Sequence, residues 1–378
     1  MLIHLIAAAR PNFMKIAPLY HALKKEDWAY PVIVHTGQHY DLNMSDAFFQ
    51  DLELPEPGIH LGIGSGSHAE QTGQVMTAYE KVLLEEKPDL VVVVGDVNST
   101  MAATIAATKI SYTNPSNPLN SLNRVGPLVA HLEAGLRSFD RTMPEEINRM
   151  VTDALADILW TPSPDGDENL LGEGVAEDKI IRVGNIMIDS LEMLRSKIES
   201  ETVCKQFDIN PRSYGIVTLH RPANVDNPQI LASLCRSLNS IAKKIPLIFP
   251  VHPRTQKNLD RFGLMPLLNP EDNIKITEPL SYIRFMNLIF NCRLAITDSG
   301  GIQEETTYLG IPCLTLRPNT ERPVTVTQGT NRLCTLNDLQ DQVTAILAGN
   351  GPSGTIPDLW DGQTANRVVA SIRAIANQ

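Results

Sequence analysis

The sequence predicts an α/β protein built from two doubly wound, parallel-sheet domains, and three observations support this. Short apolar runs alternate with longer helical patterns, which is typical of parallel sheets. The series of strands ends and then starts again in the second half of the chain. A length of 378 residues is too great for one ordinary core and suits two domains.

The first series of strands is expected at residues 2–7, 31–35, 89–95, 126–132 and 158–162. Helical patterns fall between these runs, for example at residues 15–25 and 70–86. Residues 111–124 are rich in Asn, Ser and Pro, which predicts a long loop before the fourth strand. The order of elements in this half is therefore that of one doubly wound domain.

The second series of strands is expected at residues 215–218, 247–250, 294–297 and 312–316. No strand pattern occurs between residues 185 and 210, so the domain boundary is expected there. We predict an N-terminal domain of residues 1–190, joined by a C-terminal helix at 363–378, and a C-terminal domain of residues 191–362. The carboxyl ends of the two sheets would then face a cleft, where such folds bind ligands.

Composition excludes several classes of function. The chain has 43% hydrophobic and 20% charged residues and a net charge of -11, so nucleic acid and anionic membranes would repel it. No run approaches the roughly 18 apolar residues of a membrane span, and the apolar start of the chain is interpreted as the first strand. The five cysteines form no C-x-x-C pair, which favours free thiols in the cytoplasm.

Three acidic residues are candidates for acid/base chemistry. Asp96 and Glu133 each follow an apolar strand, where an ionised group usually serves a site, because burying an unpaired carboxylate is costly. Alternatively, each caps the next helix or pairs with an arginine such as Arg137. Glu145 fits a capping box that begins at Thr142, and this structural role is at least as well supported by the sequence alone. Residues 146, 148 and 149 would then lie on the first turns of that helix.

Cationic residues recur after the strands. This recurrence would concentrate positive potential in an acidic protein and suits a diphosphate ligand. The residues are Arg10, Lys15, His220, Arg221, His252, Arg254, Arg317 and Arg322.

The turn Ser299-Gly300-Gly301 opens a helix and is a candidate phosphate cradle, since such a turn exposes backbone amides. A tight packing turn is the alternative. Glu304 or Glu305, about one helical turn later, could accept hydrogen bonds from sugar hydroxyls. The dinucleotide, Walker and G-x-S-x-G motifs are absent, so nicotinamide, ATP and serine-hydrolase chemistry lack their usual signatures. His35 and His39 have no further ligands to complete a zinc set.

Several longer motifs follow one another in a fixed order over nearly the whole chain. They are Ala9-Arg-Pro-Asn-Phe-Met-Lys-Ile-Ala-Pro18, His131-Leu-Glu-Ala-Gly-Leu-Arg137, Pro144-Glu-Glu-Ile-Asn-Arg149, Val183-Gly-Asn185, Leu219-His-Arg221, Asp298-Ser-Gly-Gly-Ile-Gln-Glu-Glu305 and Thr320-Glu-Arg-Pro323. The sequence thereby resembles the non-hydrolysing UDP-N-acetylglucosamine 2-epimerases.

This resemblance implies a GT-B fold of two Rossmann-like domains, a homodimer, and interconversion of UDP-GlcNAc and UDP-ManNAc without metal or nicotinamide. It implies that Asp96, Glu133 and Glu145 are the acid/base carboxylates and that His220 is the catalytic histidine near the diphosphate. The C-terminal domain would bind UDP. The implied substrate contacts are Arg10, Lys15, Phe285, Ser299, Gly300, Gly301, Glu305 and Arg322.

The sequence departs from the family pattern at three places. Tyr40 follows Gln38-His39 and Pro222 follows His220-Arg221, where many bacterial members carry arginines linked to activation by UDP-GlcNAc, so we expect little activation of this kind. Val324 stands where a Glu is common. Alternative functions are therefore an epimerase for another UDP-2-acetamido sugar, a hydrolysing epimerase, a GT-B glycosyltransferase and a non-enzymatic UDP-sugar sensor.

Overall fold

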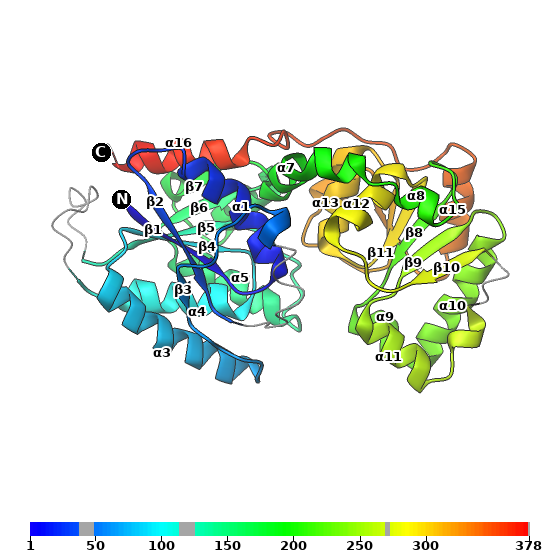
Figure 1. Cartoon of the computed structure of the whole chain (residues 1–378), viewed down its shortest axis with the longest axis horizontal. Helices are drawn as coiled ribbons and strands as arrows, with labels where there is room; N and C mark the ends of the chain where they lie inside the picture. The colour runs from blue at the N-terminus through cyan, green and yellow to red at the C-terminus, as the bar shows by residue number, and fades with distance from the viewer. Residues whose placement is uncertain (38–48, 113–124, 269–272, 377–378) are drawn as a thin grey trace. The chain divides into compact units, whose positions relative to one another are not determined.

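The computed structural model describes residues 1–37, 49–112, 125–268 and 273–376. The chain divides into two compact units, which are Met1–Met193 with Asp358–Gln378 (unit 1) and Leu194–Pro357 (unit 2). Each unit contains a parallel sheet flanked by helices, which confirms the predicted fold class of two doubly wound domains (Figure 1). The residues on which the expected lack of activation partly rests, 38–40, and most of the predicted loop at 111–124 lie outside the described residues.

The sheet of unit 1 has the strand order β3-β2-β1-β4-β5-β6-β7. Its strands are β1 (Leu2–Ala7), β2 (Tyr30–His35), β3 (Ile59–His60), β4 (Leu90–Val94), β5 (Leu128–Leu132), β6 (Ile158–Thr161) and β7 (Ile180–Arg182). All neighbouring strands pair in parallel. The order reverses between β1 and β4, and ligands of open α/β sheets bind where this reversal occurs.

Helices cover both faces of this sheet (Figure 1). They are α1 (Arg10–Leu23), α3 (His68–Glu86), α4 (Asn98–Lys109), α5 (Pro144–Leu155), α6 (Pro164–Gly172), the short η2 (Glu177–Lys179), the first part of α7 (Ile186–Ser200) and α16 (Thr364–Ala376). Helix α16 packs along α1 because Ala365, Val368, Val369 and Ile372 recur at helical spacing and are buried. The end of the chain thus completes unit 1.

Unit 2 repeats the plan with the strand order β10-β9-β8-β11-β12-β13. The strands are β8 (Gly215–Thr218), β9 (Leu247–Pro250), β10 (Ile274–Thr277), β11 (Leu294–Thr297), β12 (Cys313–Thr315) and β13 (Asn331–Leu333). The helices are the rest of α7, α8 (Val203–Gln206), α9 (Pro222–Val225), α10 (Pro228–Ala242), α11 (Pro253–Arg261), η3 (Met265–Leu267), α12 (Tyr282–Asn291), α13 (Gly300–Leu309), α14 (Val324–Thr327) and α15 (Leu339–Leu347). Here the order reverses between β8 and β11.

The strands that the sequence analysis missed are β3, β7, β10 and β13, which lie at the edges of the two sheets. They are short and none is buried along its whole length, so they lack the continuous apolar run that revealed the central strands. Helix α1 begins at Arg10, five residues earlier than expected, since Pro11 is compatible with the first turn of a helix. No helix in the described parts of the chain is long and apolar enough to cross a membrane.

Candidate active site

The predicted acids of unit 1 lie where the order of its sheet reverses. Asp96 comes two residues after β4, and Glu133 directly follows β5. Strand β4 is hydrogen-bonded to β1, which runs into the turn before Arg10. The carboxyl ends of three neighbouring strands therefore supply carboxylates and cations to one edge of the sheet, as expected of a ligand site in this fold.

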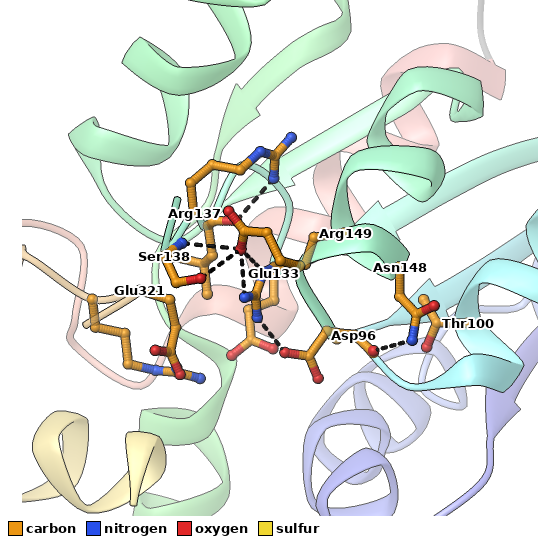
Figure 2. Close-up of polar contacts among 12 residues, drawn as sticks. Asp96, Thr100, Glu133, Arg137, Ser138, Asn148, Arg149 and Glu321 are labelled. Atoms are coloured by element: carbon orange, nitrogen blue, oxygen red, sulfur yellow. Dashed lines mark hydrogen bonds and ion pairs between the residues drawn. The ribbon is translucent and has the colours of Figure 1, made fainter. Parts of the chain in front are cut away.

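Asp96 is held by helix α5 (Figure 2). Its carboxylate forms an ion pair with Arg149, with NH1 2.5 Å from Oδ2, and its backbone carbonyl accepts a hydrogen bond of 2.8 Å from Asn148. The alternative that Asp96 caps the next helix is wrong, because the N-cap of α4 is Val97 and no side chain caps it. The expected arginine partner exists, but it is Arg149 rather than Arg137. The Asp96 side chain stays 32% exposed, so it can still reach a ligand.

Glu133 is buried and forms an ion pair with Lys15 from α1. Its φ of +76° is unusual for a residue with a side chain, and such strained positions often occur at functional sites. Both side chains lie against Gly95, where an added Cβ would be 3.0 Å from Lys15 Nζ and 3.4 Å from Glu133 Oε2. The fold thus brings Lys15, Glu133 and the residue before Asp96 together.

Glu145 is exposed on the first turn of α5, and the capping box expected for it does not form. The N-cap is Met143, and it receives no side-chain cap. Its neighbour Glu146 instead bonds back to the preceding loop and is 1% exposed. Glu146 accepts hydrogen bonds from Ser138 N at 3.0 Å and Phe139 N at 2.8 Å. Because Glu146 fills the local structural role, Glu145 remains available for other contacts.

Sequence reasoning missed the importance of Glu146, Asn148 and Arg149, which it placed on the first turns of α5 as part of the capping alternative. All three are buried. Arg149 joins Glu146, with NH2 2.6 Å from Oε2, to Asp96. The i, i+3 spacing of Glu146 and Arg149 was a signal for their pairing, but the sequence did not show that this pair faces the interior.

In unit 2, His220 follows β8 and is oriented by the buried Asp298, which follows β11. The Asp298 carboxylate lies 3.0 Å from His220 Nδ1 and accepts hydrogen bonds from His220 N, Arg221 N and Asn224 Nδ2. Burial acts to raise the pKa of Asp298, but the hydrogen bonds and the charge of His220 outweigh it and leave that pKa lowered. The contact through Nδ1 leaves Nε2 of the partly exposed imidazole for a ligand.

The turn predicted as a phosphate cradle forms the N-terminus of α13, with Ser299 as the N-cap and no side-chain cap. An added Cβ on Gly300 would be 2.7 Å from Arg322 NH1, so packing explains this glycine. At Gly301 no atom lies within 4 Å of an added Cβ, so the packing-turn alternative does not explain the second glycine. A backbone that approaches an anion closely would explain it.

Arg322 is buried beside this turn and has two acidic partners. Its Nε lies 2.9 Å from Glu304 and its NH1 lies 2.6 Å from Glu321. Glu321 also pairs with Arg317 at 2.7 Å. Burial opposes ionisation of Glu321, but the two arginines hold its pKa well below the usual range. The predicted substrate contact Arg322 therefore lies in a fixed ionic cluster next to Ser299.

Glu305 is buried on α13 and accepts a hydrogen bond of 2.7 Å from the hydroxyl of Tyr282 on α12. Burial raises the pKa of Glu305 to about 8, although the Tyr282 hydrogen bond acts against this. Phe285 is half-buried, three residues after Tyr282 on the same helix. Arg10 is exposed at the start of α1. Among the described residues, no group of three or more His, Cys, Asp and Glu side chains is placed to hold a metal ion.

Residues 21–373 match the model of the UDP-N-acetylglucosamine 2-epimerase family. The chain belongs to that family. It is 43% identical to a UDP-N-acetylglucosamine 2-epimerase of Methanococcus maripaludis, over 94% of this chain and 89% of the relative. A Pseudomonas aeruginosa protein named UDP-2,3-diacetamido-2,3-dideoxy-D-glucuronate 2-epimerase is 38% identical over 87% of this chain and 86% of its own length.

The structure is similar to the crystal structure of Methanocaldococcus jannaschii UDP-GlcNAc 2-epimerase in complex with UDP-GlcNAc and UDP. The TM-score is 0.86 with 40% sequence identity, and the match covers 99% of this chain and all of that one. Membership of the family and the GT-B fold expected from the sequence are therefore confirmed.

Proposed function

We propose that this protein reversibly converts UDP-GlcNAc into UDP-ManNAc and keeps the nucleotide sugar intact. Membership of the UDP-N-acetylglucosamine 2-epimerase family supports the reaction class. The observation that carries the proposal within this family is the pair of carboxylates after β4 and β5, Asp96 and Glu133, with Lys15 beside the second. A transferase or a sensor does not require a group of proton-handling acids in this unit.

The chemistry explains why a leaving group and several acids are required. The C2 proton of the hexose is not next to a carbonyl, so its direct removal would give an unstabilised carbanion. In anti elimination, the C1–oxygen bond breaks with its electron pair leaving on UDP, a base takes the C2 proton, and 2-acetamidoglucal forms. In syn re-addition, UDP oxygen bonds to C1 and a proton reaches the opposite face of C2. Two faces need two proton-handling groups.

We assign proton transfer to Asp96, Glu133 and Glu145. Asp96 is kept ionised and oriented by Arg149, and Lys15 provides a positive charge next to Glu133. Glu145 is exposed and is not used as a helix cap. Positioned general acids and bases of this kind contribute about 10²- to 10⁴-fold to the rate. Arg10 and Lys15, after β1, are proposed to contact the diphosphate from unit 1.

We assign binding of UDP to unit 2. The N-terminus of α13 at Ser299, Gly300 and Gly301 presents backbone amides suited to phosphate, and Arg322 lies beside it. His220, oriented by Asp298, would stabilise the charge that develops on the departing UDP, and one such donor is worth roughly 3 kcal/mol.

The nucleoside contacts are proposed on α12 and α13 of unit 2. Glu305 would accept hydrogen bonds from the ribose hydroxyls, which requires its carboxylate to be ionised. Phe285 would pack beside the uracil. The hydroxyl of Tyr282 holds Glu305 from the same helix that carries Phe285, so the two proposed contacts are fixed relative to each other.

The decisive experiment is incubation with UDP-GlcNAc in deuterated water, followed by NMR and mass spectrometry of the products. The proposal predicts deuterium at C2 in intact UDP-GlcNAc and UDP-ManNAc. Release of UDP with free ManNAc would identify a hydrolysing epimerase, and turnover only with an added acceptor would identify a glycosyltransferase. Binding without any incorporation would indicate a sensor. Asp96→Asn is the control, because it preserves shape and removes the carboxylate.

The relative from Pseudomonas aeruginosa supports a second candidate substrate, a UDP-2,3-diacetamido-2,3-dideoxyglucuronate. Both compounds have a 2-acetamido group and a UDP leaving group, so the same chemistry applies. Incubating the protein with an equimolar mixture of the two substrates measures the ratio of their kcat/KM values. A ratio above about ten in favour of UDP-GlcNAc, equal to about 1.4 kcal/mol, would support our assignment. The expected homodimer and cytoplasmic location stay predictions.

A further inference from the structure

The imidazole of His131 lies beneath the proposed acids and has no role in the mechanism described above. His131 is on β5, two residues before Glu133, and is fully buried. Its Nδ1 is 2.6 Å from Asp153 Oδ1 on α5, and its Nε2 is 2.9 Å from the backbone oxygen of Gly95. Both ring nitrogens therefore have a close oxygen partner.

Both partners accept hydrogen bonds rather than donate them. A backbone carbonyl such as that of Gly95 has no proton to donate, so Nε2 carries one. The second carboxylate oxygen of Asp153 accepts a hydrogen bond of 3.1 Å from Gly135 N and lies 2.7 Å from Arg137 NH1. Burial acts to raise the pKa of Asp153, but His131 and Arg137 outweigh it and leave that pKa lowered. An ionised Asp153 requires a proton on Nδ1 of His131 as well.

A chain of alternating charges compensates the buried imidazolium. Arg137 donates to Asp153 on one side and to both carboxylate oxygens of Glu173 on the other, at 2.7 Å each. The order is Glu173, Arg137, Asp153 and His131, and only the Glu173 side chain is substantially exposed, at 38%. Two negative and two positive groups balance one another, which makes a buried imidazolium tolerable.

The carbonyl that His131 holds belongs to the floor of the proposed site. Gly95 has a φ of +69°, directly precedes Asp96, and lies against the side chains of Lys15 and Glu133. A rotation of this peptide would move Asp96 and alter the surface on which Lys15 and Glu133 pack. The hydrogen bond from His131 Nε2 fixes that rotation.

We propose that His131 is a positioning residue, a permanently protonated imidazolium that fixes the Gly95 peptide and so sets the placement of Asp96 relative to Glu133 and Lys15. This inference rests on the proposed function for its kinetic effect. The charge of His131 itself does not depend on that function.

Two substitutions separate positioning from stability. In His131→Gln the amide nitrogen takes the place of Nε2 and can still donate to Gly95, whereas in His131→Asn it takes the place of Nδ1 and can still donate to Asp153. A purely structural role predicts that Asn, which satisfies the buried carboxylate, gives the more stable and more active variant. A positioning role predicts opposite orders, with Asn more stable and Gln more active.

The measurements are kcat and KM for epimerisation, with urea unfolding of each variant. We expect His131→Asn to lower kcat by about 10²-fold with KM little changed, as for a small misplacement of a reacting group, and His131→Gln to restore at least about tenfold. Equal activity of the two variants, or higher activity of Asn, would overturn the positioning role. Loss of activity in Asp96→Asn shows that the proposed function is sound, so the two hypotheses fail separately.

Long-range ¹H–¹⁵N NMR of the wild-type imidazole tests the charge without any substrate or variant. We expect both nitrogens of His131 to have the shifts of protonated imidazole from about pH 6 to 9, a range in which an ordinary histidine with a pKa near 6.5 is mostly neutral. A neutral tautomer at pH 7 would overturn the inference even if the protein proved to be an epimerase.

Discussion

Replacing Arg149 by methionine should destabilise unit 1, and the loss should depend on pH. Arg149 pairs with the buried Glu146 and with Asp96, which is 32% exposed. Removing one partner of a buried pair costs about 3–5 kcal/mol, whereas a pair with a solvated group contributes about 0–1 kcal/mol. Glu146 would keep its hydrogen bonds from Ser138 and Phe139, so we expect a loss near the lower value, about 3 kcal/mol, at pH 7.

The pH dependence has a definite sign. Burial opposes ionisation of Glu146, but the hydrogen bonds from Ser138 and the charge of Arg149 leave its pKa lowered. Its folded pKa is therefore below the unfolded value of about 4.3, so this group contributes stability above that pH, which is lost as the pH falls. Without Arg149 the buried carboxylate loses its cation and this contribution shrinks. The deficit of the variant should be largest near pH 7 and decrease toward pH 4.

Urea unfolding followed by tryptophan fluorescence measures this loss, because Trp28, Trp160 and Trp360 all belong to unit 1. Arg182→Met removes a partly exposed arginine that pairs with Asp167 and is the control, with an expected loss of about 0–1 kcal/mol. The double variant with Glu146→Gln should recover at least about 1 kcal/mol, because it removes the uncompensated charge. A loss for Arg149→Met that equals the control, or that does not change with pH, would refute the reasoning.

Further predictions concern unit 2 and two glycines. Burial raises the pKa of Glu305 to about 8, above its unfolded value of about 4.3, so the folded state binds the proton more tightly between these values. Stability should therefore fall as the pH rises from about 5 to 8, and Glu305→Gln should flatten that fall in hydrogen exchange of the α13 amides. Asp298→Asn should lower kcat by about 10²-fold because the histidine after β8 loses its orientation, and an unchanged kcat would contradict this role. Gly135→Ala should cost about 3 kcal/mol in unfolding experiments, since its Cβ would be 2.3 Å from the carbonyl oxygen of Gly166 at a φ of +80°. Gly301→Ala should keep or raise stability by up to about 1 kcal/mol, so weaker UDP binding in calorimetry would then report the approach of phosphate to its backbone.

The central strands of both sheets could be predicted because both of their faces are buried. Strand β4 consists of buried apolar residues throughout, and β8, β9 and β11 have the expected bounds. The edge strands β7 and β13 could not be predicted, since only three residues of each pair with a neighbour and their burial is incomplete. Their existence depends on the sheet that they extend rather than on their own sequence.

The position of Asp96, Glu133 and His220 at strand ends could also be predicted, because a polar residue directly after a buried strand lies at the ligand-binding edge of such a sheet. The partners of these residues could not. Arg149 reaches Asp96 from 53 positions away, and Asp298 reaches His220 from 78 positions away. Pairing at such separations is set by how strands are ordered in the sheet, which the chain order alone does not reveal.

Glu145 and Glu146 show how this limit affects functional assignment. The two residues have identical side chains and are adjacent on α5, yet one is exposed and the other is 1% exposed. Successive residues on a helix point about 100° apart, so the residue at which α5 begins decides which carboxylate faces the loop at Ser138. Because the helix starts at Pro144, after an uncapped Met143, that structural role goes to Glu146. A single residue of shift in the start of α5 would exchange the two roles, so the availability of Glu145 for chemistry depends on the same interaction that fixes Arg149 against Asp96.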